Sequence, residues 1–449
     1  MRVHLLLIGL CLGTTCFLGG CASASPKEAR AREQVRQIGR QLPPMPRQPA
    51  FRPDAPLDDY VRFAVIHHPA VRASYQEWKA SVDAIAPNRA LPDPKLTFEA
   101  DIADTLMTFM PGLMFDFMTR GKRNAMAVEA TAASVVAYRT YVSAVLKVAS
   151  SVRKSWIELA YLETALDLKR QSVEALRQTS ALAQAEYTTG QGMATLEQQV
   201  RLSDEEARAG SEIAMLKDKL TAARNVFRYS LGLLPEQAGS EWPHPHMAAS
   251  EVPPEAELWR RIQSSNADLA RMRDMVEMAV AGIEVAKSAG TPDFSLGAMA
   301  DLKANPLMIR PTASLSLPAW RGRIAAAVSA AQARRDAAAA RVSEEQLDMA
   351  AQLARMLAMI RESDRMISFI DRTALPNSEQ TIATAAAAYQ VGMASPAMAA
   401  NARLMAIGMR LERAAALRDR EIAVADLLLM SAETAPTGAP VLSSNNTAS

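Results

Sequence analysis

The sequence predicts a mainly α-helical protein with a small transmembrane β part. In this class, long coiled-coil α-helical hairpins are joined to four amphipathic strands per chain. The first observation that predicts it is a structural plan that occurs twice, with about 200 residues between equivalent points. The second is the alternation of apolar and polar residues in four short segments. The third is a heptad pattern in a helix too long for a compact domain.

The N-terminus predicts export and a lipid anchor. Apolar residues 5–18 end in Leu18-Gly19-Gly20-Cys21. A short apolar segment with this flank is typical of a removable signal peptide. Its last four residues resemble the lipobox of bacterial lipoproteins, so we expect a signal over 1–20 and an acylated Cys21. An ordinary signal peptide that is cut nearby is the alternative. In lipoproteins, a residue such as Ala22 after the cysteine permits sorting to the outer membrane.

Charge and hydropathy narrow the class of partner. The chain has 50 basic and 48 acidic residues, which argues against a nucleic-acid partner because such proteins carry a one-sided basic surface. After the signal, no uninterrupted run of about 18 apolar residues is present, so the sequence predicts no transmembrane helix. If the chain crosses a membrane, it must do so with strands.

The mature chain divides into a tether, two repeats and a tail. Residues 21–56 hold the lipidated N-terminus and a proline-rich tether, because closely spaced prolines favour an extended backbone. The first structural repeat is expected over 57–250 and the second over 251–430. The small and polar residues 431–449 predict a disordered tail.

Each repeat is expected to contain a helix, two strands, a long helix and a return helix. The strands are predicted at 94–104, 112–118, 293–302 and 312–318, where apolar side chains recur at every second position. In the first two strands, Leu96, Phe98, Leu113, Phe115 and Phe117 form the apolar face. The opposite face of these strands, which we expect to line a lumen, carries Glu99, Asp101, Met114, Asp116 and Met118.

The long helix of the first repeat is predicted from about residue 122 to 186. It would be close to 95 Å long at 1.5 Å per residue. Spacings of alternately four and three residues mark a coiled-coil seam, which consists of Tyr138, Val142, Val145, Ala149, Val152, Trp156 and Leu159. An amphipathic helix of a globular bundle would show the same seam, but such a bundle does not need this length.

Four amphipathic strands cannot close a barrel in one chain. Open sheet edges are excluded from lipid because their backbone groups would have no hydrogen-bond partner. Several chains that donate four strands each would solve this problem, and three chains would give twelve strands.

The duplicated plan resembles the TolC family of outer-membrane efflux channels. The resemblance rests on three features that occur in each repeat, and it covers about Leu57 to Met430. The features are the proline-aspartate elements at Pro92-Asp93 and Pro292-Asp293, the glycine corners at Gly121 and Gly322, and glycines three residues after Tyr187 and Tyr389. The lipobox and the Pro92-Asp93-Pro94 element most resemble the lipoprotein branch, which is CusC- and CzcC-like.

The resemblance implies a homotrimer with a 12-stranded β-barrel in outer membrane lipid, continued by an α-helical periplasmic tunnel. Such a channel passively conducts metal ions or small toxic compounds from an inner-membrane pump and a periplasmic adaptor. No catalytic group and no cofactor are implied. A lipid-anchored periplasmic adaptor or coiled-coil scaffold is the alternative, although an adaptor would need one hairpin with flanking β segments.

The glycine breaks are expected to be the hairpin tips, because glycine supplies the freedom for a chain reversal. In the family these tips meet the adaptor. The contact candidates here are Gly190, Gly192, Thr195, Glu197, Gly392, Met393, Ser395 and Met398. After Gly392 no acidic residue occurs before Glu412, so a charged gate of the family's type is doubtful, and packing by Met393 and Met398 could replace it.

Two further patterns carry less weight. Met107, Met110, Met114 and Met118 gather around the first strand pair; thioethers are soft ligands, but methionine is more often a flexible space-filler. The pairs His67-His68 and His244/His246 lack further ligands at fixed spacing, so we predict no metal site. No enzymatic motif stands out.

Overall fold

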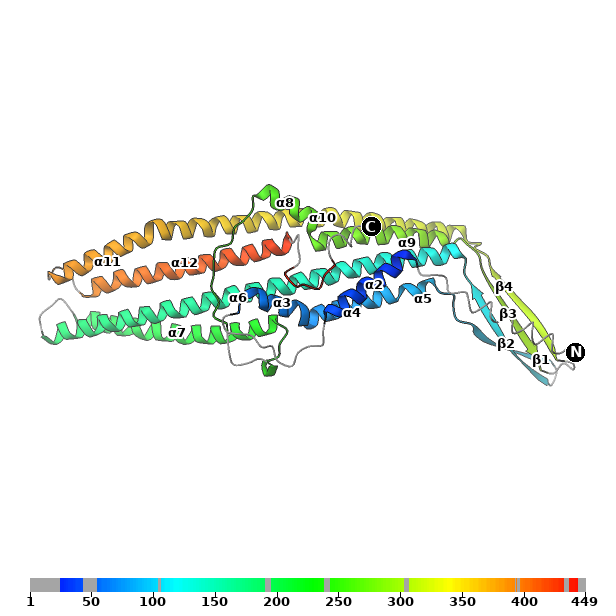
Figure 1. The fold of residues 1–449 in the computed structure, drawn as a ribbon, viewed down its shortest axis with the longest axis horizontal. Helices are drawn as coiled ribbons and strands as arrows, with labels where there is room; N and C mark the ends of the chain where they lie inside the picture. Colours follow the sequence, from blue (N-terminus) through cyan, green and yellow to red (C-terminus); the bar gives the residue numbers. More distant parts are fainter. Residues whose placement is uncertain are drawn as a thin grey trace.

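The computed structural model describes residues 25–42, 55–103, 106–189, 195–237, 243–302, 307–391, 393, 396–431 and 436–442. Nearly all of them belong to an elongated rod of helices with a four-stranded sheet at one end (Figure 1). Two long helical hairpins run side by side along the rod, and their tips lie at the end opposite the sheet (Figure 1).

The first repeat begins with short helices and leads into the sheet. Its elements are α3 (Leu57–His67), α4 (Pro69–Asp83), α5 (Ile85–Arg89), β1 (Lys95–Ala103), β2 (Leu106–Phe117), α6 (Arg120–Thr189) and α7 (Leu196–Ser230). A short 3-10 turn, η1 (Pro235–Gln237), follows.

The second repeat has the same order. Its elements are α8 (Glu255–Ser265), α9 (Ala267–Ser288), β3 (Asp293–Asp301), β4 (Met308–Ser316), α10 (Arg321–Phe369), the π-helical turn η2 (Ile370–Ala374), α11 (Leu375–Gln390) and α12 (Pro396–Met430). The repeats differ in two ways: three helices precede the strands of the first repeat and two precede those of the second, and α6 is continuous over 70 residues, whereas its counterpart is divided by η2.

Helix α6 is the central element of the rod, because it contacts α7, α9, α12 and α4. The predicted long helix is thereby confirmed, and the residues of its predicted seam face the interior. Tyr138, Val145, Ala149, Val152, Trp156 and Leu159 are all buried, and Val142 is partly buried against the same cluster. Ion pairs then connect α6 to the second repeat, among them Arg139 with Asp274 at 2.9 Å and Lys154 with Asp426.

The strands overlap the predicted segments but are not identical to them. β2 and β4 start at Leu106 and Met308, earlier than the expected 112 and 312. Both therefore pass through a proline, Pro111 or Pro311, which interrupts the sequence pattern. Pro311 lies on an edge strand, and the β2–β3 ladder ends at Gly112, next to Pro111. Neither position needs the donor that proline lacks.

The segments at the two ends of the chain are more ordered than expected. Within 21–56, residues Pro26–Gln41 form helix α2, whose Val35 and Ile38 join the core of the first repeat. The proline-rich residues 43–54 lie outside the described residues. The prediction of a disordered tail is wrong for residues 436–442, because Leu442 is buried in the same core. Hydrogen bonds to two buried tyrosines hold this segment there.

Candidate membrane sheet and hairpin tips

The sheet is antiparallel throughout, in the order β1-β2-β3-β4. Residues directly opposite each other point to the same face. Leu96 lies opposite Leu113, which lies opposite Ala298; Phe294 lies opposite both Phe117 and Leu315. The predicted alternation therefore continues in register across all four strands, and one whole face of the sheet is apolar.

The apolar face is exposed along the described parts of all four strands. Phe117 is partly buried, and eight other large side chains on this face have exposed fractions between 40% and 67%: Leu96, Phe98, Leu113, Phe115, Phe294, Leu296, Ile309 and Leu315. Contiguous apolar surface of this kind marks a contact with lipid or with another chain. Strands of nine to twelve residues also have the length of a tilted membrane crossing.

The opposite face is polar and is connected by hydrogen bonds. The Asp116 carboxylate pairs with Lys95 Nζ at 2.7 Å and accepts the hydroxyl of Ser295 at 2.6 Å, so it bridges β1, β2 and β3. Between β3 and β4, Arg310 donates to Asp301 at 2.9 Å. Glu99, Met114 and Asp116 belong to this face as predicted, and Met118 follows the end of β2. The side chains of 100–109, with Asp101 and Met107, lie outside the described residues.

Two glycines allow a close approach on the polar face. A Cβ atom on Gly112 would lie 2.6 Å from Met299 Cγ, and one on Gly297 would lie 2.6 Å from the Leu113 carbonyl oxygen. A side chain at Gly297 would force the backbone of β2 to move, and one at Gly112 would displace the Met299 and Thr97 side chains. The central strand pair therefore packs closely at these two points.

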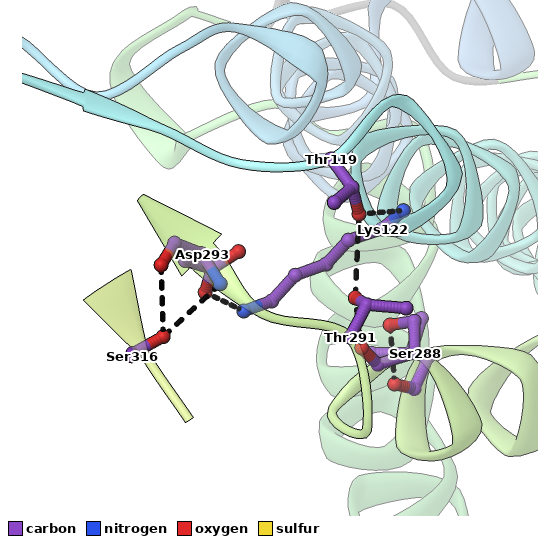
Figure 2. Close-up of polar contacts among 7 residues, drawn as sticks. Thr119, Lys122, Ser288, Thr291, Asp293 and Ser316 are labelled. Atoms are coloured by element: carbon purple, nitrogen blue, oxygen red, sulfur yellow. Dashed lines mark hydrogen bonds and ion pairs between the residues drawn. The ribbon is translucent and has the colours of Figure 1, made fainter. Parts of the chain in front are cut away.

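The sheet and the rod meet at a polar junction between the repeats (Figure 2). Lys122, at the start of α6, forms an ion pair with Asp293 at the start of β3. Beside it, the hydroxyls of Thr119 and Thr291 are 3.3 Å apart. Ser316 Oγ accepts the backbone N–H of Asp293 at 3.0 Å. Sequence reasoning missed this junction; the only signal was a basic corner and a proline-aspartate element in each repeat.

The first hairpin tip is described from Thr195 onward. Thr195 is the N-cap of α7: its hydroxyl accepts the Gln198 N–H at 3.2 Å, and the Gln198 side chain accepts the Thr195 N–H at 3.4 Å. This capping box satisfies two donors that a helix start leaves free. Glu197, in the first turn, is exposed. Gly190 and Gly192 lie outside the described residues.

The second hairpin tip presents thioethers to solvent. Met393 is 81% exposed and Met398, in the first turn of α12, is 60% exposed. Gly392 and Ser395 lie outside the described residues. Both described tips therefore lie at the end of the rod that is farthest from the sheet, with exposed side chains that no other part of the described chain covers (Figure 1).

The two histidines of the first pair contact nearby backbone groups. His68 Nδ1 accepts the Ala70 N–H and caps α4, while His67 Nδ1 lies 3.0 Å from the Phe63 carbonyl oxygen. Burial lowers the pKa of both imidazoles. Among the residues that the structure describes, no three His, Cys, Asp or Glu side chains group in a way that could hold a metal ion. No helix of the described chain has the length and hydropathy of a membrane span.

Comparison with known proteins identifies the class of this architecture. Residues 258–433 match the family model described as "Outer membrane efflux protein". No curated protein matches the sequence at a significant level.

Several solved structures have the same fold. VceC, an outer membrane protein from Vibrio cholerae, is 20% identical with a TM-score of 0.68, over 83% of this chain and 94% of that chain. CusC is 17% identical with a TM-score of 0.69, over 87% and 97%. The MtrE outer membrane channel of Neisseria gonorrhoeae, in its open state, is 16% identical with a TM-score of 0.69, over 86% and 89%.

The family match lies in the second repeat, and the solved structures share the fold over 83–87% of this chain. The second repeat is therefore similar in sequence to the outer membrane efflux protein family, and most of the chain has the fold of these solved structures.

Proposed function

We propose that three copies of this chain form an outer-membrane channel that receives substrates from a periplasmic adaptor and an inner-membrane pump. The observation that supports this most directly is the four-stranded sheet. It exposes an apolar face on every strand, carries charges on the other face, and has two outer edges, β1 and β4, without a neighbour in the described chain. In lipid such edges must be paired. Twelve strands from three copies would pair all of them and enclose a lumen.

The two faces of the sheet would lie in different surroundings, one in lipid and the other in water. The apolar face would contact lipid, and the face with Lys95, Glu99, Asp116, Asp301 and Arg310 would line the lumen. Three carboxylates against Lys95 and Arg310 leave an excess of negative charge on this face, which favours metal ions or small cationic toxic compounds over anions.

The start of α2 supports a lipid anchor at Cys21. The buried Glu28 forms ion pairs with Arg89 at 2.9 Å and Arg32 at 3.1 Å. Arg89 ends α5, which leads directly into β1. Ser25 is four positions after Cys21, so the two lie at most about 14 Å apart. An acyl chain on Cys21 would thus reach the membrane that holds the strands.

The two hairpin tips would contact the adaptor. They lie at the far end of a rod whose longest helix has 70 residues, so they would project about 100 Å into the periplasm. Exposed Glu197, Met393 and Met398 are available there, and the breaks at Gly190, Gly192, Gly392 and Ser395 would complete the contact surface.

Purification in detergent and reconstitution test this proposal. We expect a trimer by native mass spectrometry and a steady single-channel conductance in a planar lipid bilayer. A chain that remains a monomer and is soluble without detergent would rule the channel out. A trimer without conductance would instead support a lipid-anchored scaffold.

A further inference from the structure

The two outer edges of the sheet are the places where one copy would meet the next. The following inference rests on the proposed trimer and deepens it, because it specifies how β4 of one copy joins β1 of another. The two edges belong to different repeats, and the same two kinds of strand already meet once inside the chain, at β2 and β3.

The strand pairs β1–β2 and β3–β4 have identical registers. Lys95 lies opposite Met114 in β1–β2, and Ser295 lies opposite Ser314 in β3–β4, so both positions are shifted by 200 residues. Strand β2 therefore corresponds to β4, and β1 corresponds to β3. The β2–β3 joint, in which Phe115 lies opposite Leu296 and Gly112 opposite Met299, is a template for a β4–β1 joint between copies.

At the end of the β2–β3 joint that is nearest the helical rod, the two repeats are linked by the junction shown in Figure 2. There Lys122, from the helix after β2, pairs with Asp293, from the start of β3. In the other repeat, Lys122 corresponds to Arg323 and Asp293 corresponds to Asp93, so the charges are the same. Both side chains are exposed, and neither has an ion-pair partner within the described part of the chain.

The neighbouring positions change in a matched way. Thr119 and Thr291, which face each other in the internal joint, correspond to Trp320 and Leu91. Trp320 is 75% exposed and Leu91 is 38% exposed. Two polar residues in contact inside the chain are thus replaced by two apolar residues that are open to solvent, and burial against each other would remove both from water.

We propose that neighbouring copies join through a second version of this junction. Strand β4 pairs with β1 of the next copy in the β2–β3 register, which places Leu315 opposite Leu96 and Thr312 opposite Glu99. Arg323 forms an ion pair with Asp93 of the next copy, and Trp320 covers Leu91. The ladder then stops before Pro311, just as the internal ladder stops before Pro111.

Cysteine pairs test the register. With Thr312→Cys and Glu99→Cys in one chain, oxidation in membranes should link copies into covalent dimers and trimers, because directly opposite Cα atoms lie within disulfide reach. Ser314→Cys with Glu99→Cys is the matched control: it is two residues out of register and should give at least about tenfold less product. Stronger linking of the control would overturn the proposed register.

Charge reversal tests the ion pair. Asp93→Arg and Arg323→Asp should each lower the trimer fraction, by about tenfold since every trimer contains three pairs. The double variant should restore the trimer to near its original level. Arg361→Asp, at an exposed arginine already paired with Glu255 of its own chain at 2.8 Å, should have little effect. Absence of rescue in the double variant would contradict the pair.

The wild-type protein separates this inference from the channel itself. A wild type that forms no trimer overturns both. If the wild type forms a conducting trimer, the channel stands. The proposed joint is then overturned if only the shifted cysteine variant forms crosslinks, or if either single charge-reversal variant keeps the wild-type trimer fraction.

Discussion

Tyr141 donates its hydroxyl proton to the Pro440 carbonyl oxygen across 2.5 Å, although 299 residues separate the two. Two residues further along the chain, the Leu442 N–H donates to the Tyr138 hydroxyl at 3.1 Å. Both tyrosines lie on α6, Tyr138 as part of its seam, and Tyr141 is fully buried. The segment after α12 therefore returns to the first repeat and completes the core that its short helices form with α6.

Replacement of Tyr141 by phenylalanine should weaken this closure. The Pro440 carbonyl would lose a buried donor, which costs about 1–3 kcal/mol. We expect a lower midpoint of thermal unfolding in detergent, measured by circular dichroism. Tyr187→Phe, at an exposed position near the first tip, is the matched control and should change the midpoint little. Equal midpoints for Tyr141→Phe and the wild type would show that the tail contributes no stability through this bond.

The same tyrosines predict a loss of stability in alkali. Burial raises the pKa of Tyr141 and of Tyr138 above the ordinary value near 10. Above about pH 10 the unfolded chain releases these protons while the folded chain keeps them, so the free energy of unfolding falls as pH rises. The decline should be shallower in Tyr141→Phe. Parallel pH profiles of wild type and variant would contradict this assignment.

The sequence predicted the periodic parts of this fold better than its junctions. The α6 seam was found because a heptad pattern needs only local spacing. The starts of β2 and β4 were missed because Pro111 and Pro311 interrupt the pattern, and only the pairing shows that neither needs a donor there. The Lys122–Asp293 pair could not be predicted, since it joins two corners that are 171 residues apart.

The two faces of the sheet should respond differently to charge. Phe98→Arg places a cation on the apolar face and should reduce membrane assembly, because such a charge costs about 2–4 kcal/mol at the bilayer midplane. Glu99→Arg, one residue along β1 on the polar face, is the matched control and should assemble better. The measurement is the amount of trimer in the membrane fraction. Equal losses in the two variants would contradict the assignment of lipid and lumen.

The lipid anchor and the strands should act independently. Cys21→Ser removes the acyl acceptor, and we expect loss of labelling by radioactive palmitate. Part of the protein should still insert, since a closed barrel holds itself in the membrane. Membrane fractionation after a carbonate wash measures that part. A Cys21→Ser protein found entirely in the soluble fraction would argue against strands that span the membrane.

Thr195 should stabilise the first tip as an N-cap, whether or not it also contacts the adaptor. Its capping box implies that Thr195→Ala destabilises the start of α7 by about 1 kcal/mol, whereas Thr195→Asp keeps a good N-cap and adds a charge that the helix start tolerates. Proteolysis at the tip of the purified trimer should increase in the alanine variant only. Equal cleavage of both variants would mean that the cap does not hold this turn.

The second tip allows docking to be separated from folding. Met393 and Met398 are exposed, so the double variant Met393→Glu/Met398→Glu removes little buried surface and should leave the amount of trimer unchanged. In the assembled channel it would place six new carboxylates at the tip and disturb an end-on contact by desolvation and mutual repulsion. We expect weaker crosslinking to the adaptor and reduced resistance to exported compounds at a normal trimer level. The matched control is Met215→Glu, which places a carboxylate at an exposed methionine on α7, away from the tip. If the tip variant kept full crosslinking and resistance, Met393 and Met398 would not contribute to the adaptor contact, and the adaptor would have to bind elsewhere on the rod.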